Sequence, residues 1–589
     1  MERPQGAPLL FVAMGGVKIV DIKSKLLCLA SAGLVLAWLM PNHYPPWAAF
    51  HAEAMAALAL VPLALWSGFQ VRRLDALAVC ALLLSLVPLI QLVAGQIHFA
   101  GDAWMACLYL LGFGLTVQCG ASLVNRDSDG ERALDVIAPM QVAILLAAMI
   151  STGMAARQWL DLGFVSVFVI EKSADSRPYA NLAQPNQLAS LLMLGLAAVA
   201  FLYEARQVRA PFALAAAFFV TAGLAMTQSR TALLGFGLVW LAYFGLRRKS
   251  GLRTTVSALM AITVFYAVLA WIWPSMDAAL LLKHAPSLTE RIYANQRTVL
   301  WQSMIDAVAL HPWAGWGWGQ VTAAQKATAL SVPPTYWWLE SAHNLILDIA
   351  VWAGIPLSMF VTGVLFIWFA ERIRGCRDPL AWCLLVGIGC MFCHAMVEYP
   401  LYYAYFLLPA GLLMGALSRQ TSVKRSSSAP TSHRAIRLGL VALSLIAVSA
   451  YAKIVSEYFV LEQEWRDLRL SRALVGAEAP PPAPNIALLT QLQARANFSR
   501  IDPMAPMTPE QLAWMGRVSQ RYGAATFMFP YAKALAANGQ LAEAERQLEI
   551  MCRTQNPAAC RRARWEWSTF GFPAAASSAR VDASERAEP

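Results

Sequence analysis

The chain has 589 residues, of which 58% are hydrophobic and only 14% charged, and its formal net charge is +11. A soluble globular chain is about 45–50% apolar and about 25% charged. Too few charges remain here to cover several soluble domains. The composition therefore excludes a soluble multidomain protein, a disordered chain and a secreted disulfide scaffold, and it predicts an all-α polytopic membrane protein.

Apolar stretches long enough to cross a bilayer recur along the chain. A hydrocarbon core about 30 Å thick requires about 20 apolar residues per helix. Residues 9–20 are too short to span and lack a small-residue cleavage site, so residues 1–25 are expected to be a cytoplasmic N-terminal segment and not a cleaved signal peptide. Thirteen segments qualify as spans: 26–40, 47–66, 75–94, 103–123, 134–156, 188–204, 211–226, 231–246, 254–273, 345–370, 379–398, 401–418 and 436–454.

The basic residues predict how these spans are oriented. Lys and Arg occur in alternate loops, whereas the short turns at 41–46, 95–102 and 399–400 contain neither. Under the positive-inside rule this alternation places the N-terminus in the cytoplasm and the C-terminus outside. Because the basic residues punctuate apolar runs and do not cluster on one domain, nucleic acid is not an expected partner.

Two long loops and the C-terminal tail lie outside in this topology. The loops are 157–187 and 274–344, and together with the spans they complete a membrane domain over 26–454. The linker 419–435 is cytoplasmic, and no cytoplasmic segment is long enough to bind and hydrolyse a nucleotide, which excludes ATP-driven transport by this chain alone.

The tail is expected to be a small helical domain over 455–573, followed by a disordered tail at 574–589. Thr508 with Pro509 and Glu510 indicates a helix start. The segment 531–551 predicts a helix–turn–helix similar to one tetratricopeptide unit, although no repeat period is present. We expect this TPR-like domain to lean on the membrane part.

Two short motifs are interpreted as structural. Cys390, Cys393 and His394 match a haem-attachment pattern, but they lie in an apolar span where packing is the more common role. The glycine- and tryptophan-rich segment 315–319 follows an amphipathic helix at 298–310 and predicts a tight turn at the membrane surface. A disulfide between Cys552 and Cys560 outside the membrane is an open alternative.

Polar residues gather at the outer boundary of several spans. Arginine suits phosphate because its guanidinium is a permanent forked donor, and a neutral imidazole accepts a hydroxyl proton near neutral pH. Arg230 could alternatively snorkel to the interface, and tyrosines commonly anchor a helix there. No metal-ligand spacing occurs among these residues, so neither a metal nor another cofactor is expected. The candidates are Gln184, Asn186, Gln187, Ser229, Arg230, Arg297, His343, Asn344, Glu398, Tyr399 and Tyr402.

Several of these motifs together resemble a known family. Ser229-Arg230-Thr231, Arg297 with Trp301 and the segment 311–317, and His343-Asn344 are similar to the O-antigen ligase and polymerase superfamily of bacterial glycosyltransferases. Segments 43–47, 184–189 and 398–401, with the helical tail, resemble its PglL-type O-oligosaccharyltransferases.

The resemblance implies a GT-C-like fold and a function. It implies that a glycan moves en bloc, without a metal, from undecaprenyl diphosphate to a serine or threonine of an exported protein, pilin-like or otherwise periplasmic. The reaction would occur at the periplasmic face of the bacterial inner membrane, with membrane lipids as further partners.

The resemblance also assigns roles to residues. Arg230 and Arg297 correspond to diphosphate-contacting arginines and His343 to the essential histidine, while the glutamine role falls to Gln184 or Gln187. The remaining candidates would bind substrate.

Three alternatives stay open at this point. An O-antigen ligase would use lipid A–core as acceptor, and a polymerase would use a second lipid-linked glycan. A secondary transporter or lipid flippase would place polar residues near the bilayer midplane and show internal repeats. The polar candidates gather at one face instead, which favours an enzyme.

Overall fold

The structure is a computed structural model, in which every regular element of the described residues is a helix. Predictions for residues 1–21, for most of the linker 419–435 and for the tail 574–589 lie outside the described part. The described residues are 22–71, 73–124, 133–162, 166–172, 176–280, 282, 296–422, 433–472 and 483–570.

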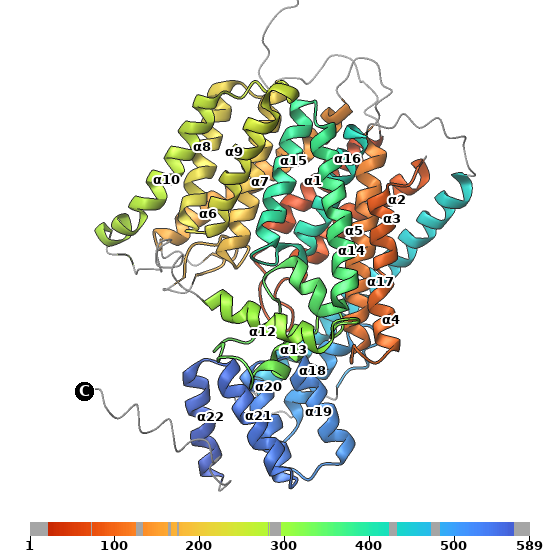
Figure 1. Cartoon of the computed structure of the whole chain (residues 1–589), viewed down its shortest axis with the longest axis vertical. Helices are drawn as coiled ribbons and strands as arrows, with labels where there is room; N and C mark the ends of the chain where they lie inside the picture. The colour runs from red at the N-terminus through yellow and green to blue at the C-terminus, as the bar shows by residue number, and fades with distance from the viewer. Residues whose placement is uncertain are drawn as a thin grey trace, which may run out of the picture.

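Each of the thirteen apolar segments coincides with a helix or a pair of helices, and these helices form the bundle in the upper part of Figure 1. Nine helical stretches among the described residues are long and apolar enough to cross a membrane, which supports a multi-pass membrane protein. α8 and α15 are shorter, so the count of thirteen spans stays a prediction. The helices of the bundle are α1 (Ile22–Leu39), α2 (Phe50–Gln70), α3 (Ala76–Leu84), α4 (Val87–Val93), α5 (Ala100–Leu123), η1 (Ala133–Ile137), α6 (Ala138–Trp159), α7 (Pro185–Glu204), α8 (Ala210–Met226), α9 (Arg230–Ser250), α10 (Val256–Ala279), α14 (Leu345–Gly375), α15 (Pro379–Ala395), η2 (Pro400–Tyr402), α16 (Ala404–Thr421) and α17 (His433–Arg472).

Two segments predicted as continuous are broken. The segment 75–94 is divided into α3 and α4, with a proline at the start of α4. α14 is interrupted at Gly354, whose φ is +81°, two residues before Pro356. Proline lacks the amide hydrogen that would continue a helix, and only glycine takes this φ without a steric cost.

The break in α14 is stabilised by the glycine-rich turn predicted at 315–319. The amides of Trp316 and Gly317 donate to the carbonyls of Val351 and Trp352 at 2.7 and 3.0 Å. The side chain of Gln91 donates to the same Trp352 carbonyl at 2.8 Å. These bonds satisfy backbone groups that the interruption exposes, as an apolar surrounding requires. The turn therefore supports the bundle itself.

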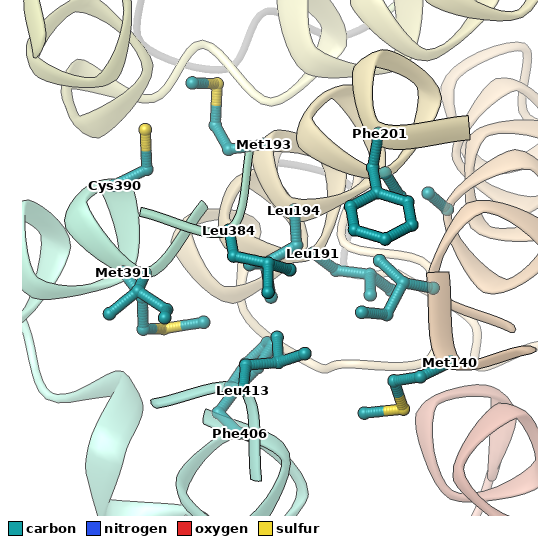
Figure 2. Packing of buried hydrophobic residues seen from close by; sticks show 14 of the residues in the cluster. Met140, Leu191, Met193, Leu194, Phe201, Leu384, Cys390, Met391, Phe406 and Leu413 are labelled. Carbon is teal, nitrogen blue, oxygen red and sulfur yellow. The ribbon is translucent and has the colours of Figure 1, made fainter. Parts of the chain in front are cut away.

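Apolar side chains from α6, α7, α15 and α16 fill the centre of the bundle. Leu191 and Leu194 of α7 lie beside Leu384 of α15 and Leu413 of α16 (Figure 2). Where α5 and α16 cross, a Cβ on Gly120 would lie only 1.9 Å from the Leu412 carbonyl oxygen. Small residues of this kind let membrane helices approach closely. The packing fixes α7 against α15; α7 begins and α15 ends at the candidate site described below.

The C-terminal helices form a separate group at one end of the bundle, below α12 and α13 in Figure 1. The helix start at Thr508 is confirmed, because its side chain and that of Gln511 form a reciprocal capping box. α17 runs from His433 to Arg472 and so continues past the predicted domain boundary at residue 454, which stays a prediction. The TPR-like character stays a prediction. The C-terminal helices are α18 (Thr490–Arg500), α19 (Pro509–Arg521), α20 (Ala525–Ala537), α21 (Leu541–Thr554) and α22 (Pro557–Thr569), and the two helices above them are α12 (Gln296–Leu310) and α13 (Val321–Thr328).

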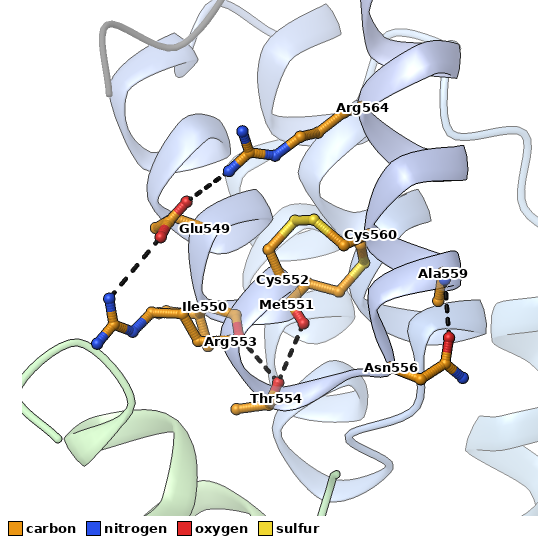
Figure 3. The surroundings of a disulfide bond; sticks show 10 residues. All are labelled: Glu549, Ile550, Met551, Cys552, Arg553, Thr554, Asn556, Ala559, Cys560 and Arg564. Carbon is orange, nitrogen blue, oxygen red and sulfur yellow. Dashed lines mark hydrogen bonds and ion pairs between the residues drawn. A yellow bond between two sulfur atoms is a disulfide. The ribbon is translucent and has the colours of Figure 1, made fainter. Parts of the chain in front are cut away.

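A disulfide joins Cys552 of α21 to Cys560 of α22 (Figure 3), which settles the alternative left open by the sequence. Cys390 is buried within α15, and His394 of the same motif contacts the Ser190 hydroxyl of α7 through Nδ1. The motif thus takes part in helix packing.

Candidate functional site

Five segments distant in sequence meet around one carboxylate, that of Glu398. The residue lies in the turn between α15 and η2, and only 7% of its side chain is exposed. Its Oε1 accepts hydrogen bonds from Arg297 Nη2 at 2.5 Å and from Asn186 Nδ2 at 2.9 Å. Its Oε2 accepts one from His343 Nδ1 at 2.9 Å. α7, α12 and the segment before α14 are thereby joined to the end of α15.

The charge state of Glu398 follows from these partners. Burial alone would raise its pKa, but the hydrogen bond and charge of His343 and the charge of Arg297 outweigh burial and lower the pKa below its usual value. Glu398 is therefore an anion at neutral pH. An ionised carboxylate only accepts hydrogen bonds, so His343 must donate from Nδ1, and its Nε2 is the nitrogen left to accept a proton.

The backbone around His343 is held in a conformation unusual for a histidine. Its φ is +54°, in the left-handed region. Its amide donates to Ser341 Oγ at 2.9 Å, and Ser341 Oγ donates to Asp348 Oδ2 at 2.8 Å. Asp348 Oδ1 also accepts the amide of Ala342 at 2.7 Å. A strained backbone held by several bonds is typical of functional sites.

α9 begins at the same site. Ser229 is its N-cap, and the Ser229 hydroxyl donates to Asn186 Oδ1 at 2.8 Å. Asn186 thereby connects Ser229 to Glu398. Arg230 is the first residue of α9, directly before the predicted span 231–246. A cation at the positive end of a helix dipole is electrostatically unfavourable, whereas an anion there is favoured.

The two predicted phosphate-binding arginines lie within electrostatic range of each other. Burial lowers the pKa of Arg297 most, and the positive charge of Arg230 lowers it further, while Glu398 opposes both effects. Two arginines at this distance suit an anion with several oxygens, because each guanidinium is a forked donor.

The other sequence-predicted residues surround this network. The Tyr399 ring contacts the His343 ring edge to face at 5.0 Å between centroids. Asn344 caps α14 and donates to the Met396 carbonyl at 3.1 Å, so it holds the His343 segment against the end of α15. Both contacts position the imidazole.

Three predicted residues lie outside the network. Gln187 is buried and accepts the Tyr405 hydroxyl at 2.5 Å, while Tyr402 packs against Trp352 at 5.3 Å. Gln184 is the half-exposed N-cap of α7, and no side-chain hydrogen bond caps the helix there. The structure thus brings together Asn186, Ser229, Arg297, His343 and Glu398, with Arg230 and Tyr399 beside them.

Sequence reasoning missed the residues that hold these side chains in place. Arg177 Nη1 donates to the carbonyls of Thr227 and Gln228 at 2.5 and 3.1 Å, which fixes the turn before α9. Ser341 and Asp348 fix the backbone of His343. An acidic residue in the first turn of an apolar helix was the available signal for Asp348. In the described part of the chain, no group of three or more His, Cys, Asp or Glu could hold a metal ion.

Comparison with known proteins gives three matching family models. A model described as O-Antigen ligase matches residues 214–362, and one described as Protein glycosylation ligase matches 178–203. A third, described as the C-terminal part of a virulence factor membrane-bound polymerase, matches 380–558. The three matched ranges contain every residue of the network around Glu398.

Two curated relatives come from Acinetobacter baylyi. A "General O-oligosaccharyltransferase" is 29% identical over 562 residues, which cover 91% of this chain and 94% of the relative. A "ComP-specific O-oligosaccharyltransferase" is 25% identical over 396 residues, covering 67% of this chain and 70% of the relative. No solved structure matches the chain.

Proposed function

We propose that the chain is a PglL-type O-oligosaccharyltransferase within the O-antigen ligase superfamily, as the matching models and relatives indicate. In this proposal it moves a glycan en bloc from undecaprenyl diphosphate to a serine or threonine of an exported protein. The general activity is glycosyl transfer from a lipid-linked oligosaccharide to protein. The observation that carries the proposal is the Glu398 network, in which Arg297 and His343 share one buried carboxylate beside Arg230.

The arginines suit the leaving group. Breaking the bond between the sugar and the diphosphate releases negative charge on the phosphate oxygens. Arg230 and Arg297 provide permanent donors for that charge, in a part of the molecule where water is partly excluded. The N-terminus of α9 adds the positive end of its helix dipole to the same side.

His343 suits the attacking group. Its Nδ1 is oriented by Glu398, so Nε2 can accept the proton of the acceptor hydroxyl as the oxygen attacks the anomeric carbon. The new bond joins the acceptor oxygen to the sugar, the diphosphate leaves with the bonding electrons, and direct displacement inverts the configuration. Glu398 itself is a positioning residue in this scheme.

The charge distribution along α9 supports a periplasmic site. Arg230 begins this 21-residue helix, and Arg247, Arg248 and Lys249 lie in its last turn, about 30 Å away at 1.5 Å per residue. By the positive-inside rule the cluster in the last turn faces the cytoplasm. The site at the other end then faces the periplasm, together with the C-terminal helices. We propose the bacterial inner membrane as the location, and an exported, pilin-like or other periplasmic protein as the acceptor.

The proposal is tested with purified protein, undecaprenyl-diphosphate glycan and candidate acceptors. We expect His343→Ala and Arg230→Ala to lower kcat by at least about 10²-fold, because loss of a general base or of one oxyanion-type donor has that effect in other enzymes. Arg230→Lys should lose most activity as well, since the planar fork is removed. Arg247→Ala, at the opposite end of α9, is the control and should keep its activity.

The product identifies the acceptor class. Glycan on a protein band supports the proposal, whereas glycan on lipid A–core indicates a ligase and a glycan ladder indicates a polymerase. Wild-type rates in both His343→Ala and Arg230→Ala would refute the assigned roles.

A further inference from the structure

A hollow lies within the membrane bundle outside the network around Glu398. Helices α2, α5, α16 and α17 enclose a cavity of about 150 Å³. It extends along α2 from Phe50 to Leu65, which is about four helical turns. We refer to it as the α2–α17 cavity.

α2 and α17 contact each other at both ends of the cavity. At one end the rings of Phe50 and Tyr458 stack at 3.5 Å between centroids. At the other, α17 passes so close to Gly68 that a Cβ there would lie 3.2 Å from Val441 Cγ2. Between these contacts several of the lining residues are small, as Ala57 and Ala447 are. Short side chains normally let membrane helices close together, but here they leave space between the two contacts.

The chemistry of the lining selects a hydrocarbon. Leucine, valine, alanine and aromatic side chains make up most of it, and among the described residues Glu53 is the only charged one that lines it. The Glu53 carboxylate already accepts the Tyr109 hydroxyl and the Ala404 amide. The described lining contains no lysine or arginine that would bind an anionic headgroup. The occupant's polar end has to lie elsewhere.

A short series of aromatic contacts connects the cavity to the site. Ala404 lines the cavity and follows Tyr403, which lies within electrostatic range of both Glu53 and Glu398. The Tyr403 ring stacks on Tyr399 at 6.2 Å, and Tyr399 contacts His343 at 5.0 Å between centroids. A lipid whose diphosphate lies at Arg297 therefore has the cavity close to its first carbons.

From this arrangement we infer that the α2–α17 cavity binds the polyprenyl chain of the lipid-linked donor, at the part of the chain nearest the diphosphate. The inference rests on the function proposed above, and it assigns the hydrocarbon part of that substrate to four particular helices. The cavity anchors the donor, and the glycan remains on the side of Arg230, Arg297 and His343.

Filling the cavity tests this assignment. Ala447→Phe places a ring in the hollow, whereas Ala442→Phe on the same helix places one on an exposed face and serves as the matched control. We expect Ala447→Phe to raise the KM for the full-length donor at least about tenfold, because each buried methylene contributes about 0.8 kcal/mol. A glycan diphosphate capped by a methyl group has no polyprenyl chain to enter the cavity. With this donor, both variants should have the KM of the wild type. Equal KM for the full-length donor in all three proteins, or an equal loss with both donors, would overturn the inference.

Photolabelling tests the cavity without relying on turnover. A donor with a diazirine in its polyprenyl chain, bound to the wild-type protein, should label α2, α5, α16 or α17, and excess polyprenyl phosphate should suppress the label. Label on other helices, or suppression by phosphatidylglycerol to the same extent, would contradict a polyprenyl seat. If the wild type transferred no glycan to protein, the proposed function would fail. The position of the label would still show whether the cavity binds a polyprenyl chain.

Discussion

Glu398 receives hydrogen bonds from side chains that lie 55, 101 and 212 residues away in the sequence. The sequence indicated the individual residues, because an arginine or histidine at the edge of an apolar segment stands out from its neighbours. It did not indicate the pairing, since an acidic residue beside several tyrosines looks like an ordinary membrane-interface segment. The pairing depends on α7 packing against α15, which is a property of the folded bundle.

Replacing the Glu398 carboxylate by its neutral isostere tests its positioning role. In Glu398→Gln, Arg297 loses its counter-charge and His343 loses the acceptor that orients it, so we expect kcat to fall about 10²–10³-fold with a smaller change in KM. Initial rates at several donor and acceptor concentrations separate the two constants. Glu371→Gln removes a carboxylate that is 58% exposed and should keep wild-type rates. Unchanged kcat in Glu398→Gln would show that the carboxylate does not position His343.

At the scale of elements, the spans were the most predictable part of the fold because long apolar runs have few alternative structures. The interruption of α14 was not predicted, since its apolar run continues through Gly354 and Pro356. The partners that stabilise the break, Trp316, Gly317 and Gln91, come from distant segments. The glycine- and tryptophan-rich pattern at 315–319 predicted a tight turn, but it could not show that this turn stabilises the break in α14.

Gly354→Ala tests the break. The alanine would have to adopt φ +81°, and its Cβ would lie 2.4 Å from the Trp313 carbonyl oxygen. We expect a loss of more than about 1 kcal/mol of stability, because alanine at positive φ is strained even without the contact. Gly363→Ala in the same helix meets no atom within 4 Å and is the control. Thermal unfolding midpoints of the two purified variants should differ, with the Gly354 variant lower; equal midpoints would contradict a strained break.

The contact between α13 and α19 predicts a pH dependence. Lys326 of α13 donates to the backbone carbonyl and hydroxyl of Ser519 at 2.5 and 3.0 Å. Burial lowers the pKa of Lys326 from 10.5 to about 7. Between pH 7 and pH 10.5, Lys326 is protonated in the unfolded state and deprotonated in the folded state. The free energy of unfolding therefore rises by up to about 1.4 kcal/mol per pH unit in this range. Below pH 7, Lys326 is protonated in both the folded and the unfolded state, so its contribution to the free energy of unfolding no longer changes with pH.

Lys326→Met isolates that effect. The midpoint of thermal unfolding of the wild type should rise from pH 6.5 to pH 8.5 by more than that of Lys326→Met, because the variant lacks the titrating group. Parallel pH profiles for the two proteins would show that Lys326 stays protonated when folded.

At the scale of the whole molecule, the C-terminal helices are attached to the membrane part through arginines. Arg521 Nε donates to both carboxylate oxygens of Asp102 at 2.9 Å, and Arg495 donates to the Pro46 carbonyl at 2.8 Å. The sequence predicted a helical domain leaning on the membrane part, but not these partners, because they join segments hundreds of residues apart. The attachment makes the C-terminal helices part of the structure around the site.

Arg553 of α21 contacts the segment that leads to His343. Its side chain donates to the carbonyls of Ala329 and Val332 at 2.8 Å each, and its own carbonyl accepts the amide of Tyr336 at 3.0 Å. The segment held in this way continues to His343. Arg553→Ala removes both side-chain bonds, and a hydrogen bond to a charged group contributes about 1.5–3 kcal/mol.

We therefore expect Arg553→Ala to insert normally, to lower the transfer rate about tenfold or more, and to make residues 329–342 more susceptible to proteolysis. Arg546→Ala on the same helix removes an exposed ion pair with Glu543 and should change neither property. Transfer rates and limited proteolysis of both variants check this. Full activity with a protected loop in Arg553→Ala would mean that the C-terminal helices lie beside the site without holding the His343 segment in place.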